Sequence, residues 1–263
     1  MISTLTRLNW VRFAILSLGA MLTQACGNPG HPGAPERNEL AVAAAANLTQ
    51  VAGVLGQKFE AATGIHPVYS FASTAQLTQQ IENGAPFDVF LSADAAHVKE
   101  LEDKGLLASG GRAAYAVGVL SLWVPPGSRA KITRIEDLTR PEVRVIAVAK
   151  PELAPYGQAA VEALERSGVW EQVQSKIVYA ENINMARQYG TSGNADAVFT
   201  AKSLILGDGG RSIEVGEALH APVVQELGIL ANAGHAAAAR RFATFLREGA
   251  GRDVLAASGY RVP

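Results

Sequence analysis

The sequence predicts an α/β protein of two lobes, each built on a doubly wound mixed sheet. Short apolar runs alternate with amphipathic stretches along most of the chain, which favours parallel strands connected by helices. Two longer extended apolar runs, residues 117–124 and 221–230, bracket the middle of this series. They predict two crossings between an outer lobe, residues 39–119 plus 223–263, and an inner lobe, residues 120–222, hinged around a cleft.

Periodicity predicts the elements of each lobe, and Gly and Pro mark where they end. The outer lobe is expected to hold a strand at 40–45, a helix ending before Gly64, a strand at 66–71, a helix capped by Thr74, a strand at 87–91, a helix through Leu101 and two closing helices around Phe242 and Val254. The inner lobe is expected to hold a strand at 143–148, a helix after Pro155, a strand at 177–180, a helix after 181–184 and a strand at 195–199.

The first 25 residues have the pattern of an export signal, because Arg7 and Arg12 precede an apolar core too short to span a bilayer. Cys26, the only cysteine, follows directly in a context similar to a bacterial lipoprotein cleavage site, although the preferred Leu lies one place too far upstream. Either Cys26 carries a lipid anchor, or the protein is cut nearby and keeps an incidental thiol. The Gly- and Pro-rich residues 26–38 predict an extended linker and favour the anchor. We expect a periplasmic or otherwise extracytoplasmic protein.

Two strand-to-helix junctions carry small polar residues and no charge, with Asn47 at the first and Ser73 and Thr74 at the second. A helix start leaves backbone N–H groups unpaired and carries partial positive charge, so two converging starts can hold an oxyanion without Lys or Arg. Neutral junctions favour an anion held by hydrogen bonds and fully dehydrated. The alternative is that Asn47 and Thr74 are ordinary helix N-caps.

Charge and residue spacing argue against nucleic-acid binding, a metal centre or catalysis. Two of the 23 basic residues lie in the signal segment, so the rest of the chain has 21 basic and 24 acidic residues. This slight excess of acidic residues does not match the basic surface of a nucleic-acid-binding protein. The five histidines lack metal-ligand spacing. Asp88 and Asp94 fall in a strand and at a helix start, where capping is favoured over carboxylate catalysis. Ser128 and Lys131 lie in a loop with no companion motif, so we expect no enzymatic activity and no cofactor.

Four segments, residues 44–49, 71–77, 84–94 and 154–160, occur in the order found in the periplasmic molybdate-binding proteins that serve ABC transporters. From about Leu40 to its end the chain resembles this family. The resemblance implies the type II periplasmic-binding-protein fold, capture of molybdate or tungstate, and delivery to a membrane permease driven by an ATPase.

The resemblance also implies a ligand set in which every member can donate a hydrogen bond to an oxyanion, which has only acceptors. The positions are Asn47, Ser73 and Thr74 from the outer lobe, Tyr156 and Ile183 from the inner lobe, and Ala46 and Thr200 as weaker candidates. Two of them depart from the common pattern. Asn47 stands where many members have Ser, and Thr200 stands where many have a Tyr that binds the ligand. The chain is therefore similar to a variant subgroup in which the ligand Tyr lies at the position of Tyr156 instead. Taken alone, Tyr156 would be an aromatic in a turn.

The identity of the ligand stays open at this point. Sulfate and molybdate share charge and shape, whereas protonated phosphate calls for an acceptor carboxylate and no candidate ligand is acidic. An exported enzyme acting on an anionic substrate is the alternative from another class. We expect a monomer that contacts the membrane only through a lipid anchor, binds no nucleic acid, and meets molybdenum only as an oxyanion without direct protein–metal ligands.

Overall fold

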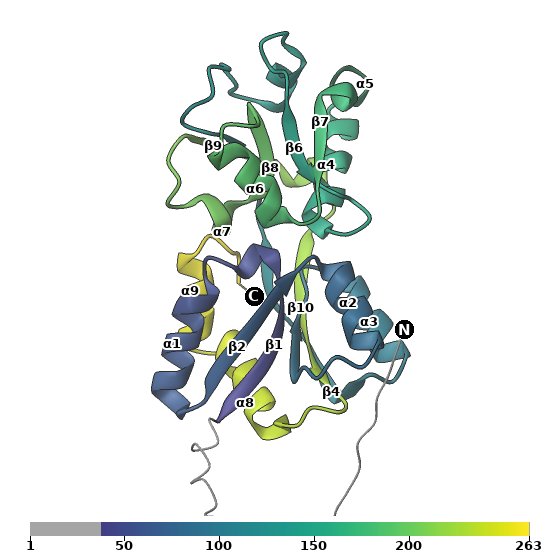
Figure 1. The fold of residues 1–263 in the computed structure, drawn as a ribbon, viewed down its shortest axis with the longest axis vertical. Coiled ribbons are helices and arrows are strands. Elements are labelled where there is room, and N and C mark those ends of the chain that lie inside the picture. The colour runs from purple at the N-terminus through teal and green to yellow at the C-terminus, as the bar shows by residue number, and fades with distance from the viewer. Residues whose placement is uncertain (1–37, 263) are drawn as a thin grey trace, which may run out of the picture. The chain divides into compact units, whose positions relative to one another are not determined.

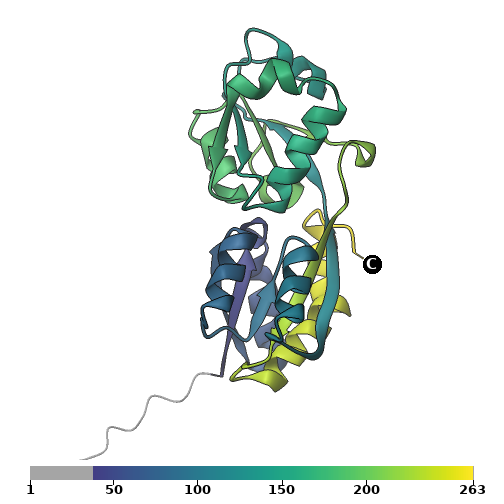
Figure 2. The same ribbon diagram turned by 90° about the vertical axis from the view of Figure 1, so that its right-hand side faces the viewer.

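The computed structural model describes residues 38–262, and these form two five-stranded mixed sheets flanked by helices (Figures 1 and 2). The export signal predicted at 1–25, Cys26 and nearly all of the predicted linker lie outside the described residues. The two-lobed α/β fold predicted from the sequence is confirmed. No helix within residues 38–262 is long and apolar enough to cross a membrane.

The first sheet has the strand order β2-β1-β3-β10-β4. Its strands are β1 (Glu39–Ala45), β2 (His66–Ala72), β3 (Val89–Leu91), β4 (Leu107–Gly118) and β10 (Val223–Leu230). The first three are parallel to one another, and β10 is antiparallel to both β3 and β4. Parallel strands end at the same edge of a sheet, so the segments that follow β1, β2 and β3 lie close together.

Alternation along β1 explains why helices cover both faces of this sheet. Val42 and Ala44 face a core formed with α1 (Ala52–Thr63), α8 (Ala236–Arg247) and α9 (Ala250–Ala257). Ala43 faces the opposite side, where α2 (Thr74–Glu82) and α3 (Ala96–Asp103) pack. Figure 1 shows α1 and α9 on one side of the sheet and α2 and α3 on the other.

The second sheet has the order β7-β6-β8-β5-β9. Its strands are β5 (Leu120–Val124), β6 (Ile146–Ala149), β7 (Ile177–Ala180), β8 (Ala197–Ala201) and β9 (Arg211–Glu214). The helical elements of this part of the chain are α4 (Pro155–Arg166), α5 (Trp170–Val173), α6 (Ile183–Thr191) and α7 (Lys202–Ile205), with short 3-10 turns η2 (Ile135–Thr139), η3 (Gln174–Lys176) and η4 (Glu217–Leu219). Trp123 and Phe199 are fully buried in its core.

Two chain connections join the sheets, one from β4 to β5 and one from β9 to β10, and we call them the crossings. The run at 117–124, predicted as one extended segment, is divided between the sheets at Val119, because β4 ends at Gly118 and β5 begins at Leu120. Beside the first crossing, β4 and β10 pair side by side as antiparallel strands (Figure 2).

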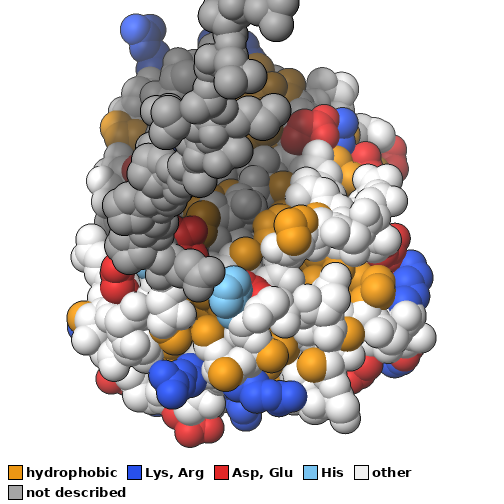
Figure 3. Space-filling view, turned by 60° about the horizontal axis from the view of Figure 1, so that its bottom comes forward, with side chains coloured by type: hydrophobic (Ala, Val, Ile, Leu, Met, Phe, Trp, Pro, Cys, Tyr) orange, Lys and Arg blue, Asp and Glu red, His pale blue; other side chains and the backbone are white. Residues whose placement is uncertain are grey.

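Charges of both signs share the face of the molecule shown in Figure 3, where Lys and Arg side chains lie close to Asp and Glu side chains. Polar atoms separate many of the hydrophobic side chains on that face. The charge distribution there has no single-sign field of the kind that nucleic-acid-binding surfaces use.

Candidate functional site

Four helical starts meet at one small pocket. They belong to α2, α4, α6 and the 3-10 turn η1 (Ala46–Leu48), which follows β1 directly. The pocket is lined by Ala45, Ala46, Asn47, Ser73, Thr74, Ala93, Ala154, Pro155, Tyr156, Asn182 and Ile183. None of these side chains carries a charge, and the cavity volume of about 10 Å³ is far below the roughly 300–1,000 Å³ of sites for drug-sized ligands. The site therefore suits a small ion or molecule bound through neutral groups.

The outer-lobe part of the pocket includes the first turn of α2. Ser73 is the N-cap of this helix: its Oγ accepts a hydrogen bond from Gln76 N at 3.4 Å, and the Gln76 side chain accepts from Ser73 N at 3.2 Å. Thr74, predicted as the cap, is instead the first helical residue. Its Oγ1 accepts a hydrogen bond from Ala93 N at 3.2 Å. Both hydroxyls are buried and keep their own proton for another acceptor.

Asn47 lies in η1 and its side chain caps no helix, so the ordinary N-cap explanation is wrong for this residue. Its Nδ2 donates to Gln225 Oε1 and to the Tyr260 hydroxyl, each at 3.0 Å. Its Oδ1 is buried without a hydrogen-bond partner among the described residues. The expectation that this amide nitrogen is free to donate into the pocket is therefore not met in this arrangement, because both of its protons are used within the protein.

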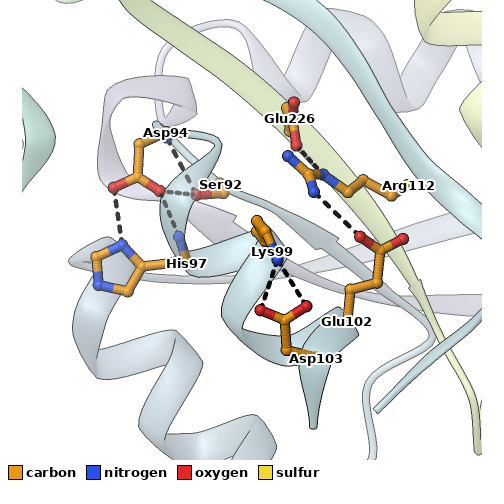
Figure 4. Close-up of polar contacts among 8 residues, drawn as sticks. All are labelled: Ser92, Asp94, His97, Lys99, Glu102, Asp103, Arg112 and Glu226. Atoms are coloured by element: carbon orange, nitrogen blue, oxygen red, sulfur yellow. Dashed lines mark hydrogen bonds and ion pairs between the residues drawn. The ribbon is translucent and has the colours of Figure 1, made fainter. Parts of the chain in front are cut away.

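The loop after β3 places Ala93 at the pocket and is fixed by a local hydrogen-bond network (Figure 4). Asp94 Oδ1 accepts from Ser92 Oγ at 3.2 Å and from His97 N at 3.0 Å, and its Oδ2 lies 2.7 Å from His97 Nδ1. The hydrogen bond to Asp94 raises the pKa of His97, and partial burial opposes it. Asp94 thus stabilises the start of α3, the structural role expected for it.

One ion pair connects the same helix to the sheet, and a second one joins two strands beside it. Arg112 of β4 contacts Glu226 of β10 and, at 3.0 Å, Glu102 of α3 (Figure 4). Asp88, the other carboxylate considered from the sequence, just precedes β3. It accepts hydrogen bonds from the backbone of Ala41 and from His235. Neither Asp88 nor Asp94 lines the pocket.

Tyr156 comes from the first turn of α4, which begins with Pro155 at a position where a missing N–H costs nothing. The helix start lies close to the end of β6 because Gly157 has no side chain: a Cβ there would be 2.2 Å from the carbonyl oxygen of Ala149. Tyr156 is 1% exposed, and its Oη accepts a hydrogen bond from Gln225 Nε2 at 2.9 Å. Burial raises its pKa well above the ordinary value.

The fourth helical start belongs to α6, where Asn182 is the N-cap and its Oδ1 accepts from Met185 N at 3.0 Å. Ile183 is the first residue of the helix, 4% exposed, and lines the pocket beside Asn182. The first N–H groups of a helix have no intrahelical acceptor, so the backbone of Ile183 is available to a ligand.

Of the ligand candidates among residues 38–262, only Thr200 does not line the pocket. It lies in β8 opposite Ser121 of β5, fully buried, and neither hydroxyl has a partner among the described residues.

Hydrogen bonds link the two lobes directly around the pocket. Ala75 N, in the first turn of α2, donates to the carbonyl of Leu153 just before α4, at 3.2 Å. Ser203 Oγ of α7 donates to the carbonyl of Asn47 at 3.2 Å. These contacts hold the helical starts of both lobes around one buried space.

The chemistry of the site follows from the direction of its hydrogen bonds. The hydroxyls of Ser73, Thr74 and Tyr156 each already accept an N–H from the protein. A hydroxyl whose oxygen accepts in this way presents its proton to a ligand. The pocket is therefore rich in neutral donors, contains no His, Cys, Lys, Asp or Glu, and matches a small species that offers only acceptor oxygens.

Sequence reasoning missed the second row of residues behind the pocket, namely Gln225, Tyr115 and Tyr260. All are 5% exposed or less. The signal for Gln225 was present, because an amide within an apolar extended run must find buried partners. No such signal marks the two tyrosines.

Comparison with known proteins agrees with this geometry. The family described as "Bacterial extracellular solute-binding protein" matches residues 40–261. The molybdate-binding protein ModA of Rhodobacter capsulatus is 35% identical, over 84% of this chain and 88% of its own length. ModA of Azotobacter vinelandii is also 35% identical, over 94% and 96%. The solved Azotobacter vinelandii periplasmic molybdate-binding protein superposes with a TM-score of 0.81 at 30% identity, covering 85% of this chain and 99% of that one. The chain belongs to the bacterial extracellular solute-binding proteins, within the family of the molybdate-binding proteins.

Proposed function

We propose that this protein captures molybdate, and tungstate with it, in the pocket between the two lobes and delivers it to the permease of an ABC transporter. The observation that carries the proposal is the set of three buried hydroxyls whose oxygens are occupied by protein N–H groups. A hydrogen bond to a charged group contributes about 1.5–3 kcal/mol. Five such bonds would supply the roughly 8 kcal/mol of micromolar binding and more.

The proposed ligands are the side chains of Ser73, Thr74 and Tyr156 and the backbone N–H groups of Asn47 and Ile183. All five line the pocket. The side chain of Asn47 takes part only through its hydrogen bonds to Gln225 and Tyr260 behind the pocket. A protonated oxyanion would bring a donor to a site made of donors, so the chemistry favours a fully ionised dianion.

A panel of thermal shifts on the mature protein tests this function, with molybdate, tungstate, sulfate and phosphate as ligands. At 100 times its dissociation constant a ligand adds about 2.7 kcal/mol to the free energy of unfolding. In a chain of this size that corresponds to about 5–10 °C in Tm. We expect this shift with molybdate and tungstate and a much smaller one with sulfate. Equal shifts with all four would contradict selective capture, and no shift with molybdate would contradict the function itself.

The same geometry supports a carrier rather than an enzyme. No residue that lines the pocket titrates near neutral pH, and a hydrolytic site needs a base within reach of its nucleophile. We propose that the protein acts as a monomer outside the cytoplasm, exported by residues 1–25 and anchored through a lipid on Cys26. Mass spectrometry of the mature protein from its native membrane would test the anchor, because an unmodified thiol at Cys26 would exclude it.

We propose further that ligand binding closes two moving lobes, residues 39–119 plus 223–263 and residues 120–222, and that the permease recognises the closed form. Support comes from the composition of the pocket, to which each lobe supplies two helical starts. Neither pair surrounds a tetrahedral ion alone, so dehydration of the ion requires both lobes.

A further inference from the structure

Gln225 of β10 is a fully buried amide that lies behind the pocket without lining it. Its Oε1 accepts a hydrogen bond from Asn47 Nδ2 at 3.0 Å, and its Nε2 donates to Tyr156 Oη at 2.9 Å. Gln225 Oε1 also lies 2.8 Å from the hydroxyl of Tyr115. That hydroxyl has one proton, and the carbonyl of Ser92 and Gln225 Oε1 are both within reach as its acceptor. One side chain beside a crossing therefore connects a pocket residue of the outer lobe to a pocket residue of the inner lobe.

The contact between Gln225 and Tyr156 depends on a glycine in the neighbouring strand. A Cβ at Gly118 would lie 2.0 Å from Tyr156 Oη and 2.7 Å from Gln225 Nε2. Any larger residue at this end of β4 would displace the phenol from the amide. The backbone of the crossing thus provides the space in which the two side chains meet.

The direction of these hydrogen bonds determines what Tyr156 can offer. The Asn47 and Gln225 amides are oriented together. The Tyr260 hydroxyl donates its proton to the backbone carbonyl of Asn47, so its oxygen accepts from Asn47 Nδ2, and Nδ2 in turn requires Oε1 of Gln225 as its second acceptor. In the observed orientation the phenol oxygen accepts from Gln225, so the phenol proton points to another acceptor. Burial raises the pKa of Tyr156, so this proton is retained across the neutral range.

We propose that Gln225 is a positioning residue, which holds the Tyr156 hydroxyl as a donor toward the bound oxyanion and links it to Asn47. The inference rests on the proposed oxyanion site and adds a specificity element that does not touch the ligand. A side chain at position 225 that could only accept would draw the phenol proton to itself. The phenol would then present a lone pair to the ligand oxygens.

Gln225→Glu tests this idea, because an ionised carboxylate of the same shape can accept from Tyr156 but cannot donate to it. Molybdate affinity is measured by titration calorimetry for Gln225→Glu, for Tyr156→Phe and for the double variant, at pH 7.5. We expect Gln225→Glu to weaken binding at least tenfold more in the presence of Tyr156 than in the Tyr156→Phe background. Repulsion between the new charge and the dianion is common to both backgrounds and cancels in this comparison. Equal losses in the two backgrounds would overturn the proposal.

Gln158→Glu is the matched control, since it adds the same charge on an exposed position of the helix that carries Tyr156. Its affinity should equal that of the wild type. The wild type, the two single variants and the double variant form a double-mutant cycle. If urea denaturation shows that Gln225→Glu does not fold, Gln225→Met takes its place in this cycle. We expect Gln225→Met to weaken binding severalfold more with Tyr156 present than in the Tyr156→Phe background, where only the contacts with Asn47 and Tyr115 are lost. Losses that are equal in both backgrounds would again refute the positioning role.

The wild type separates failure of this inference from failure of the proposed function. A wild type that binds no molybdate contradicts the function. The cycle is then run with whichever oxyanion of the thermal panel does bind, and the same coupling is expected. A wild type that binds molybdate while the cycle shows no coupling contradicts only the role of Gln225.

Discussion

Removing one oxygen atom from Tyr156 should separate the two tasks of its hydroxyl. In Tyr156→Phe the ligand loses one donor, and a hydrogen bond to a charged group is worth about 1.5–3 kcal/mol. The dissociation constant for molybdate should therefore rise about 10- to 150-fold. The protein itself also loses a bond, because Gln225 Nε2 donates to this hydroxyl and is fully buried. An unpaired buried donor costs about 1–3 kcal/mol, so the ligand-free variant should stay folded with a lower free energy of unfolding.

Titration calorimetry measures the first effect and urea denaturation of ligand-free protein the second. Thr200→Val is the control: it also removes a fully buried hydroxyl, but one that lacks a partner among the described residues and lies outside the pocket. Its affinity for molybdate should match the wild type. Lower stability of Tyr156→Phe with unchanged affinity would show that the hydroxyl only supports the fold, and the site as we have drawn it would be wrong.

Three further outcomes are expected. Asn47→Ala should weaken molybdate binding by about 1–3 kcal/mol in calorimetry and lower the stability seen in urea, because Gln225 and Tyr260 both lose their contact with Nδ2; unchanged affinity would remove Asn47 from the site. Molybdate affinity should stay constant from pH 7 to 9, because burial raises the pKa of Tyr156 above its ordinary value of about 10 and the phenol keeps its proton throughout. A loss of affinity within this range would point to another protein group that binds the ion and titrates there. Solution scattering should give a smaller radius of gyration with molybdate than without it, and identical curves at saturation would argue for a rigid site.

Local patterns in the sequence predicted most of the fold because the elements are regular. Strands such as β1 and helices such as α2 show the periodicity of buried surfaces, so their existence and order followed directly. The cap of α2 was misplaced by one residue, since Ser73 and Thr74 are both good caps and only the backbone shows where the helix begins. The extended run at 117–124 gave no hint of its division at Val119, because an apolar strand looks the same whichever sheet it joins.

The neutral donors of the pocket were predictable, whereas the contacts that orient them were not. Asn47 and Gln225 lie 178 residues apart in the chain and meet only because β10 runs antiparallel between β3 and β4. The register of that pairing is a property of the whole sheet and leaves no local trace in the sequence. The same holds for Gly118, whose missing side chain matters only because Tyr156 and Gln225 occupy the space beside it.

The bonds from Ala75 to Leu153 and from Ser203 to Asn47 involve no ligand atom. Any free energy they contribute is present in an empty molecule as well as in a loaded one, so under the proposed closure it would shift the balance between open and closed forms before an ion arrives. Strengthening them by about 1.4 kcal/mol would multiply the ratio of closed to open empty molecules tenfold. A transporter that recognises closure would then meet more carriers without cargo. Under the closure proposed above, tight capture favours strong contacts between the lobes, whereas recognition of loaded carriers alone favours weak ones.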